Sequence, residues 1–300
     1  MKRFAIAMSL AMSACLAHAL TPLPDALSAQ PVVDGTVRVA RELRPGVTYH
    51  EVHFANWTGD GPLAAHFLVV DWKSVDAAFT FAVVPGKDGN RSRPSDLAKG
   101  TNAIAAVNGV FHRMTDPYLA FYARKIAGVV SPSQHAGGDG CFAFNRGEMP
   151  YVGRFTKDVL AKYENVLSAD GMPRANPKEA QMTKAKRQKL RAPRTFVGNV
   201  TSNRLTVLVV VDGRQGRSTG LTYTENRRLL EAWGCDQMTN LDGGGSSVMI
   251  LKDVAPDLKG RTANGPCRIM NVPSDGLPLM SVERRVSESL MLLDGVGDLR

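Results

Sequence analysis

The eight residues Asn-Leu-Asp-Gly-Gly-Gly-Ser-Ser at positions 240–247 constrain this chain more than any other stretch. Three consecutive glycines carry no Cβ atoms, so the loop can adopt positive φ angles and its backbone N–H groups can lie against a bound anion or sugar. Asp242 adds a carboxylate, and the two serines add hydroxyls. A tight turn closed by Asp and Ser would have the same composition. The rest of the sequence has to distinguish a turn from a binding site.

The first 19 residues have the pattern of a secretion signal. Lys2 and Arg3 precede an apolar stretch, and the Ala-His-Ala sequence at 17–19 is typical of a signal-peptidase site. We therefore expect residues 1–19 to be removed and the protein to be secreted or periplasmic. A lipoprotein with its lipid on Cys15 is the less favoured alternative, because the apolar run before that cysteine is short.

The net charge of +9 is concentrated in one segment. Residues 174–194 contain eight basic residues and Glu179 as the single acidic one, a net charge of +7. Export argues against a nucleic-acid partner for such a segment. A contact with anionic polymers or membranes of the cell envelope and a merely solvated loop both remain open.

Three cysteines remain after removal of the signal: Cys141, Cys235 and Cys267. In an oxidising compartment we expect one disulfide and one buried thiol, with Cys235 and Cys267 as the preferred pair. No pair of cysteines or histidines has the spacing of zinc ligands.

Strand-length apolar runs and helix signals alternate along the 300 residues, of which 44% are hydrophobic. Short helices are predicted at 94–99 and after the capping-box pair Thr222 and Glu225. Predicted strands cover 65–72, 80–84, 103–107, 205–211, 238–241 and 247–251. This order predicts an α/β fold of the mixed α+β kind, with a central mixed β-sheet and flanking helices in a single domain.

The predicted domain spans residues 45–296. Residues 20–44 are expected to form an extended lead-in, and 156–193 a basic insertion that carries little of the core. Asp212 and Asp242 each follow a predicted strand. If those two strands run parallel, both carboxylates open on the same edge of the sheet.

Several motifs of this chain occur in an order typical of phosphodiester glycosidase domains. They lie at 105–111 (AAVNGVF), 193–198, 211–220, 240–247 and 271–286. The chain resembles this family over residues 103–293, and the 240–247 motif together with Asn108 is the most specific part. Three features depart from the family pattern: His112 replaces a second aromatic residue, Arg285 replaces a common proline, and the basic 174–193 stretch resembles an insertion. We expect His112 to be a satisfied polar or half-buried residue rather than a base.

The resemblance implies a hydrolase that cleaves the glycosidic bond of a sugar phosphodiester and releases sugar and a phosphate monoester. The second pKa of such a monoester is about 6, so it can leave as an anion without being protonated. Its departure is therefore helped by cations and N–H donors more than by a general acid. Asp242 or Asp212 would stabilise the reacting carbon, attack it or activate water. The implied substrate-binding residues are Asn108 and Asn240 for sugar hydroxyls, and Arg194, Arg214, Arg284, Ser218, Ser246, Ser247, Gly243, Gly244 and Gly245 for phosphate.

The expected partner is a glycan or sugar-phosphate substrate, and no cofactor is expected. Two alternatives from other classes stay open. One is a non-catalytic envelope protein that binds an anionic polysaccharide through the same arginines and glycines. The other is a metal-assisted phosphodiesterase that cleaves the P–O bond, with Asp212 and Asp242 as ligands of a divalent cation.

Overall fold

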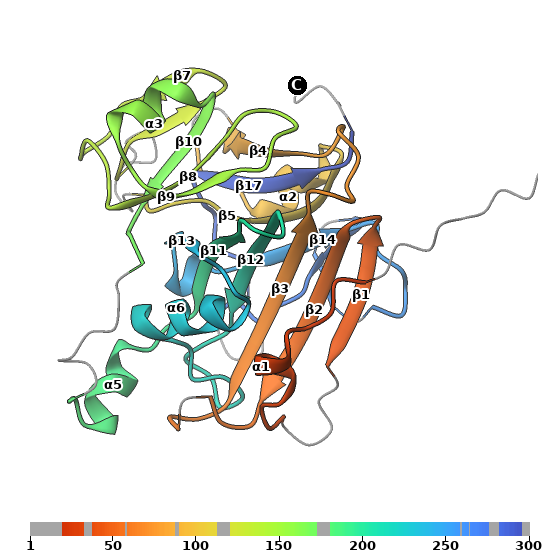
Figure 1. Ribbon diagram of the computed structural model, residues 1–300, viewed down its shortest axis with the longest axis vertical. Helices are drawn as coiled ribbons and strands as arrows, with labels where there is room; N and C mark the ends of the chain where they lie inside the picture. Colours follow the sequence, from red (N-terminus) through yellow and green to blue (C-terminus); the bar gives the residue numbers. More distant parts are fainter. Residues whose placement is uncertain are drawn as a thin grey trace, which may run out of the picture.

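The computed structural model describes residues 20–32, 38–57, 59–87, 90–112, 121–172, 181–258, 260–263, 265–275 and 282–295. Strands dominate these residues and form three antiparallel sheets (Figure 1). The predicted fold class, a mixed α/β domain with one central mixed sheet and flanking helices, is therefore wrong. The predicted signal peptide at 1–19, with Cys15, lies outside the described residues.

The first sheet is open and has six strands among the described residues. Their order is β1 (Val39–Arg44), β2 (Val47–Phe54), β3 (Leu63–Asp71), β12 (Leu205–Val211), β11 (Arg194–Val200) and β13 (Gln237–Asn240), with β1 and β13 at the edges. β1 belongs to the predicted lead-in, which therefore contributes a strand to this sheet.

The other two sheets pack against the first. The second has the order β7 (Val129–Ser131), β6 (Arg124–Ile126), β10 (Asn165–Ala169), β8 (Gly140–Phe144) and β9 (Tyr151–Arg154). The third has the order β15 (Arg261–Thr262), β16 (Cys267–Ile269), β14 (Met249–Lys252), β5 (Ala103–Asn108), β17 (Glu288–Leu293) and β4 (Thr80–Pro85). One apolar core is shared by residues of all three sheets.

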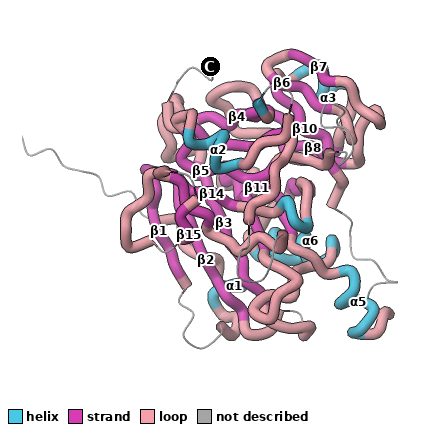
Figure 2. Tube along the Cα trace, turned by 180° about the vertical axis from the view of Figure 1, so that it is seen from behind, coloured by secondary structure: helices cyan, strands magenta, loops and turns pink. Residues whose placement is uncertain are grey.

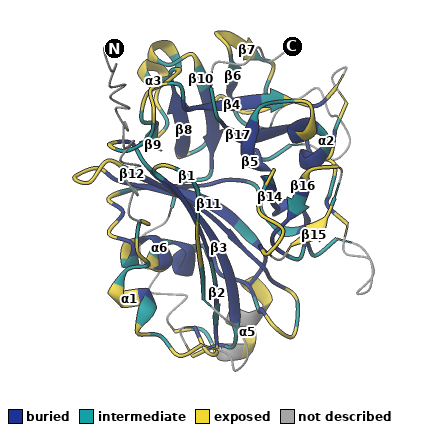
Figure 3. Ribbon diagram, turned by 90° about the vertical axis from the view of Figure 1, so that its right-hand side faces the viewer, coloured by how far each residue is buried: buried dark blue, intermediate teal, exposed yellow. Residues whose placement is uncertain are grey.

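Strand β3 shows why the predicted fold class differs from the structure. All its residues but the last are buried, as Figure 3 shows for most of the first sheet. Leu68 and Val70 belong to the core shared by the sheets, whereas Phe67 and Val69 belong to a second core that includes residues of helix α6 (Tyr223–Ala232). A strand buried on both faces is typical of a sheet between helix layers. Here another sheet covers one face, and the apolar pattern is the same in both cases.

Helices form a small part of the described structure (Figure 2), and α6 contributes Leu229 and Leu230 to the core on one face of the first sheet. α6 begins with the predicted capping box, in which the Thr222 hydroxyl and the Glu225 carboxylate each accept a hydrogen bond from the other residue's backbone N–H. α2 (Pro94–Lys99) coincides with the predicted helix and packs Leu97 on the third sheet. The other described helices are α1 (Asp25–Ser28), α3 (Lys157–Lys162) and α5 (Lys184–Leu190), and the described residues also contain the 3-10 turn η2 (Gly244–Ser246). None of the helices in the described ranges is long and apolar enough to cross a membrane.

The predicted insertion at 156–193 differs from expectation because part of it belongs to the core. It contains β10, the central strand of the second sheet, whose Val166 and Leu167 are fully buried. Arg191 is also buried and forms ion pairs with Glu225 and, at 3.4 Å, with Asp60. The basic surface of this segment is therefore smaller than its charge count implies.

The preferred disulfide between Cys235 and Cys267 is wrong. Both residues and Cys141 are buried free thiols, and Cys235 and Cys267 lie in different apolar clusters.

The 240–247 loop joins two sheets. It leaves the first sheet at the end of β13 and enters the third at β14. β12 and β13 both pair antiparallel with β11, so they run in the same direction and end at the same edge. Asp212 and Asp242 therefore follow strand ends on one side of the molecule. The C-terminal end of β5 and the start of β17 also lie there, where Asn108 pairs with Ser289.

Candidate active site

Asp242 lies at this junction with its side chain 15% exposed. The Gly243 N–H donates to its Oδ1 at 2.8 Å, and the Ser246 side chain is also hydrogen-bonded to the carboxylate. Burial raises the pKa of Asp242 to about 6, although these hydrogen bonds and the charge of Arg284 favour the ionised form. Within the part of the chain that the structure describes, Asp242 forms no ion pair with an arginine. It is a carboxyl group poised to exchange a proton near neutral pH.

His112 is the nearest imidazole to this carboxylate. Its Nδ1 lies 3.8 Å from Asp242 Oδ2, and its side chain is 3% exposed. Neither ring nitrogen makes a well-formed hydrogen bond with a described residue, but the Val110 backbone lies close enough to one of them to oppose the lowering of the pKa of His112. Burial, reinforced by the charges of Arg91 and Arg284, lowers the pKa of His112 to about 4, so the imidazole is neutral at pH 7 and the contact is not an ion pair. His112 as a whole residue is half-buried, in agreement with the expectation of a satisfied polar or half-buried residue, but its proximity to Asp242 was not predicted. The signal that could have found it is its place directly after the Asn108 motif.

A guanidinium lies over each of the three glycines of the loop. Gly245 matters most, because a Cβ atom there would overlap Asp275 and Arg284, whereas at Gly243 or Gly244 it would meet the arginine at an ordinary contact distance. A Cβ atom would lie 3.6 Å from Arg194 Nη1 at Gly243, 3.6 Å from Arg214 Nη2 at Gly244, and 2.5 Å from Arg284 Nη2 at Gly245. Gly244 also has φ +63°, which favours glycine. The structure therefore brings together the predicted arginines and the predicted glycines.

The three arginines differ in how far their charges are already used. Arg194 is held in place by a hydrogen bond from its Nε to the Leu221 carbonyl at 3.0 Å and by stacking on Tyr223. Arg284 forms a two-pronged pair with Asp275 at 2.5 and 3.0 Å. Arg214 is exposed and makes no hydrogen bond or ion pair with a described residue. Arg214 is thus the guanidinium that is most available to an incoming anion.

The backbone of the loop offers fewer donors than the sequence suggested. The N–H groups of Gly243, Gly244, Ser246 and Ser247 all donate within the protein. The Gly245 N–H makes no such bond with a described residue. Arginine side chains, rather than a row of N–H groups, therefore supply most of the positive charge at this loop.

Asp212 has its carboxylate turned into the protein. It is fully buried, its Oδ2 accepts from Arg217 at 2.6 Å, and its Oδ1 accepts from Asn271 and from the Val272 N–H at 3.2 and 2.8 Å. The Ser218 hydroxyl donates to the Asp212 carbonyl at 2.6 Å. These contacts give Asp212 and Ser218 a structural role, and the structure does not bring their side-chain oxygens to Asp242.

Asn108 and Asn240 also use their amides within the protein. Asn108 donates to the Asp242 carbonyl at 2.7 Å and accepts from Thr195 and the Val248 N–H, so it fixes the backbone that carries Asp242. Asn240 accepts from Asn226 at 2.8 Å and donates to the Gly171 carbonyl at 3.0 Å. In this structure both amides hold the loop in place rather than face a ligand.

The serines of the loop are both fully buried. The Ser246 side chain faces Asp242, and its Oγ lies 3.5 Å from Arg284 Nη1. The Ser247 hydroxyl has no partner among the described residues, whereas its carbonyl accepts from Asn271 at 3.1 Å.

A buried ion pair that sequence reasoning missed lies beside the site. Glu288 is almost fully buried, pairs with Arg124 and accepts from the Val110 N–H at 3.0 Å. Burial raises the pKa of Glu288, and its charge contributes to the raised pKa of Asp242. A Cβ on Gly109 would lie 2.5 Å from Glu288 Oε1, which explains this glycine. An acidic residue at the head of the apolar run ESLMLL is the signal that could have found it.

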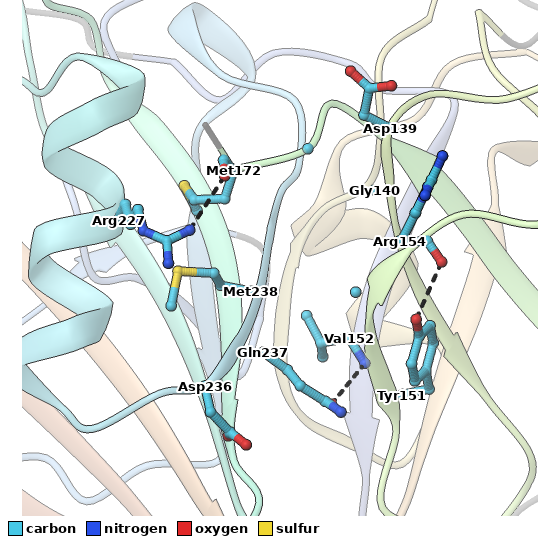
Figure 4. A pocket seen from close by; sticks show the side chains of 12 residues that line it. Asp139, Gly140, Tyr151, Val152, Arg154, Met172, Arg227, Asp236, Gln237 and Met238 are labelled. Atoms are coloured by element: carbon cyan, nitrogen blue, oxygen red, sulfur yellow. Dashed lines mark hydrogen bonds between the residues drawn. The ribbon is translucent and has the colours of Figure 1, made fainter. Parts of the chain in front are cut away.

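A separate cavity of about 720 Å³ opens where β13 faces β9 (Figure 4). Its lining includes Arg154 and Tyr151 on one side and Arg227 and Met238 on the other. Of the residues named above at the site, Gly171, which accepts from Asn240, lines it, whereas Asp242, His112 and the three arginines do not. It is therefore not the candidate active site.

Comparison with known proteins places this geometry in a family. Residues 101–293 match the model of the phosphodiester glycosidase family. Over 168 residues the chain is 28% identical to the SPbeta prophage-derived uncharacterized protein YomE of Bacillus subtilis (strain 168), which covers 53% of this chain and 26% of that protein. The chain thus spans about a quarter of the length of this curated relative.

Two solved structures share the fold. One is the catalytic domain of zebrafish N-acetylglucosamine-1-phosphodiester alpha-N-acetylglucosaminidase, auto-inhibited by pro-peptide, with a TM-score of 0.61 and 17% identity over 90% of this chain and 92% of that chain. The other is a protein from Synechocystis, with a TM-score of 0.56 and 13% identity over 86% of this chain and 64% of that chain. Because the family model matches well over half of its residues, this chain belongs to the phosphodiester glycosidase family.

Proposed function

We propose that the protein hydrolyses the glycosidic C–O bond of a sugar phosphodiester, with Asp242 acting at the anomeric carbon. The observation that carries this proposal is the contrast among the acidic residues of the site. Asp212, Asp275 and Glu288 each pair with an arginine. Asp242 does not, and it lies beside a loop crossed by three guanidinium groups. Asp242 is thus a carboxylate that has no arginine partner among the described residues and can activate water at the anomeric carbon. The arginines are available to the leaving phosphate.

The proposed reaction divides these groups between the two ends of the breaking bond. The C–O bond to phosphate breaks, and its electron pair leaves with the phosphate monoester. Arg214 and Arg284 stabilise the added charge, because guanidinium N–H groups match phosphate oxygens in geometry and stay protonated. Water supplies the oxygen of the released sugar, and Asp242 takes the proton of that water.

The contacts of Asp212 disfavour the metal-assisted alternative. A cation shared by Asp212 and Asp242 would need a carboxylate oxygen from each. Both oxygens of Asp212 are occupied by N–H donors, so a metal would have to displace Arg217 or the 271–272 segment. We therefore propose turnover without a divalent cation.

N-acetylglucosamine 1-phosphodiesters are the substrates that we propose to test first, since the zebrafish relative is named for that class. Export also remains a proposal, resting on the signal pattern at 1–19. Intact-mass measurement of the protein purified from expressing cells tests export, because cleavage of the signal would leave residue 20 at the N-terminus. Contact of the exposed part of 174–194 with the anionic envelope is proposed on charge alone.

The test of the proposed reaction is hydrolysis of the methyl phosphodiester of N-acetylglucosamine 1-phosphate in the presence of EDTA. Wild-type protein is expected to release free sugar and methyl phosphate, and Asp242→Asn to lose at least about 1,000-fold in kcat. Asp257→Asn is the matched control, because Asp257 is 61% exposed and pairs with Arg41 at 2.6 Å. Binding of the diester without turnover by wild-type protein would instead support the non-catalytic polysaccharide-binding alternative.

A further inference from the structure

We propose that His112 is a further catalytic residue, which together with Asp242 holds the water that attacks the anomeric carbon. The inference rests on the proposed function and adds a second residue to the same site. It assigns a chemical role to a histidine that the proposed reaction does not use.

The first argument is the distance between the two side chains. His112 Nδ1 and Asp242 Oδ2 lie 3.8 Å apart, which is too long for a direct hydrogen bond. An oxygen atom placed about 2.8 Å from each would hydrogen-bond to both. The separation of these atoms therefore allows one shared oxygen.

The second argument is that the two ring nitrogens of His112 have at most one partner among the described residues, the Val110 backbone, although the side chain is only 3% exposed. Buried polar atoms in folded proteins almost always have a hydrogen-bond partner, which can be water or a ligand. A side chain needed only as an apolar wall would carry no such atoms. The imidazole is thus able to receive a polar group such as water.

The third argument comes from the charges that face the imidazole. They are the guanidinium groups of Arg91, Arg284 and Arg124, and the carboxyl group of Asp242. The three cations and burial keep the imidazole neutral, with a pKa of about 4. A neutral ring can accept a hydrogen bond on one nitrogen, which a protonated ring cannot do.

These features give a balanced step. The water donates one hydrogen to His112 and the other to Asp242, so its lone pairs face the anomeric carbon. As the new C–O bond forms, the bond from carbon to the phosphate oxygen breaks and its electron pair leaves with the phosphate. The proton moves from water to Asp242, and His112 stays neutral. His112 orients the nucleophile and Asp242 receives the proton.

The test compares His112→Phe with His112→Gln on the methyl phosphodiester of N-acetylglucosamine 1-phosphate. His112→Phe keeps an aromatic wall and is expected to lower kcat about 10- to 100-fold with little change in KM. His112→Gln keeps a hydrogen-bonding group and should recover part of that loss. In water–methanol mixtures, the ratio of methyl glycoside to free sugar should rise in His112→Phe, because water has lost its positioning residue. Thermal unfolding of each variant checks the fold.

Two results would overturn the inference. One is a His112→Phe variant with wild-type kcat and an unchanged product ratio, which would make His112 part of the wall. The other is a raised KM with unchanged kcat, which would assign His112 to a sugar hydroxyl instead of water. Either result leaves the proposed function intact as long as Asp242→Asn is inactive. Failure of wild-type protein to hydrolyse the diester would reject the proposed function itself.

Discussion

Replacing Asp242 by Asn is expected to stabilise the folded protein above pH 6 while it abolishes turnover. The ordinary pKa of an aspartate is 3.8, and burial raises that of Asp242 to about 6. At 1.36 kcal/mol per pKa unit, this difference of roughly two units corresponds to about 3 kcal/mol. The carboxyl group is thus easier to ionise in the unfolded chain than in the folded protein.

The sign of the effect follows from proton binding. Below about pH 4 the carboxyl group is protonated in both states and makes no difference to stability. Between pH 4 and 6 the unfolded chain loses its proton first, so the free energy of unfolding falls as pH rises. Above pH 6 the full cost of about 3 kcal/mol applies. Asparagine has no proton to lose and can still accept from the Gly243 N–H.

The assay is urea unfolding of both proteins at pH 4.5, 6 and 7.5, with free energies obtained by linear extrapolation. The advantage of Asp242→Asn should be about 1 kcal/mol at the lowest pH and reach at most about 3 kcal/mol at the highest. Asp212→Asn is the contrasting variant: its NH2 group cannot accept from Arg217, although its remaining oxygen can still accept from Val272, and it should destabilise by about 1–3 kcal/mol at pH 7.5. An Asp242→Asn variant that is less stable than wild type at pH 7.5 would refute the reasoning.

Three further predictions concern the same site. Arg214→Ala should leave the unfolding temperature unchanged, because Arg214 is exposed and makes no bond to a described residue. It should weaken the binding of inorganic phosphate and lower kcat/KM about 10- to 100-fold. Calorimetry and initial rates measure these effects, and an unchanged affinity for phosphate would contradict the prediction. Gly245→Ala places a Cβ 1.8 Å from Asp275 Oδ1, so it should cost about 1–3 kcal/mol in urea unfolding and disturb the pair with Arg284; wild-type stability would show that the loop yields freely. The rate of hydrolysis should rise with pH through a midpoint of about 6 as Asp242 ionises; a pH–rate profile that is flat from pH 5 to 7 would remove Asp242 as the base.

The sequence predicted the local elements well where a single apolar run or cap decides them. β12 and α2 have the predicted bounds, since the LTVLVVV run and the Pro94 to Gly100 boundaries are strong local signals. The predicted architecture was wrong because a buried strand such as β3 has the same pattern whether helices or a second sheet cover it. That choice depends on contacts between segments distant in sequence.

The candidate site shows the same division. The sequence correctly identified the arginines and the glycines that lie together at the 240–247 loop. It could not distinguish Asp242 from Asp212, because each follows a strand and precedes glycine. The difference arises from Arg217 and Val272, which occupy the oxygens of Asp212. His112 was missed because its proximity to Asp242 joins residues 130 positions apart in the chain.

The most direct test of the central claim is hydrolysis of the methyl phosphodiester of N-acetylglucosamine 1-phosphate in ¹⁸O-labelled water. Because Asp242 is proposed to direct water to the anomeric carbon, mass spectrometry should find the label in the released sugar and none in methyl phosphate. Label in the phosphate product would show P–O cleavage and contradict the assignment of Asp242 to the reacting carbon.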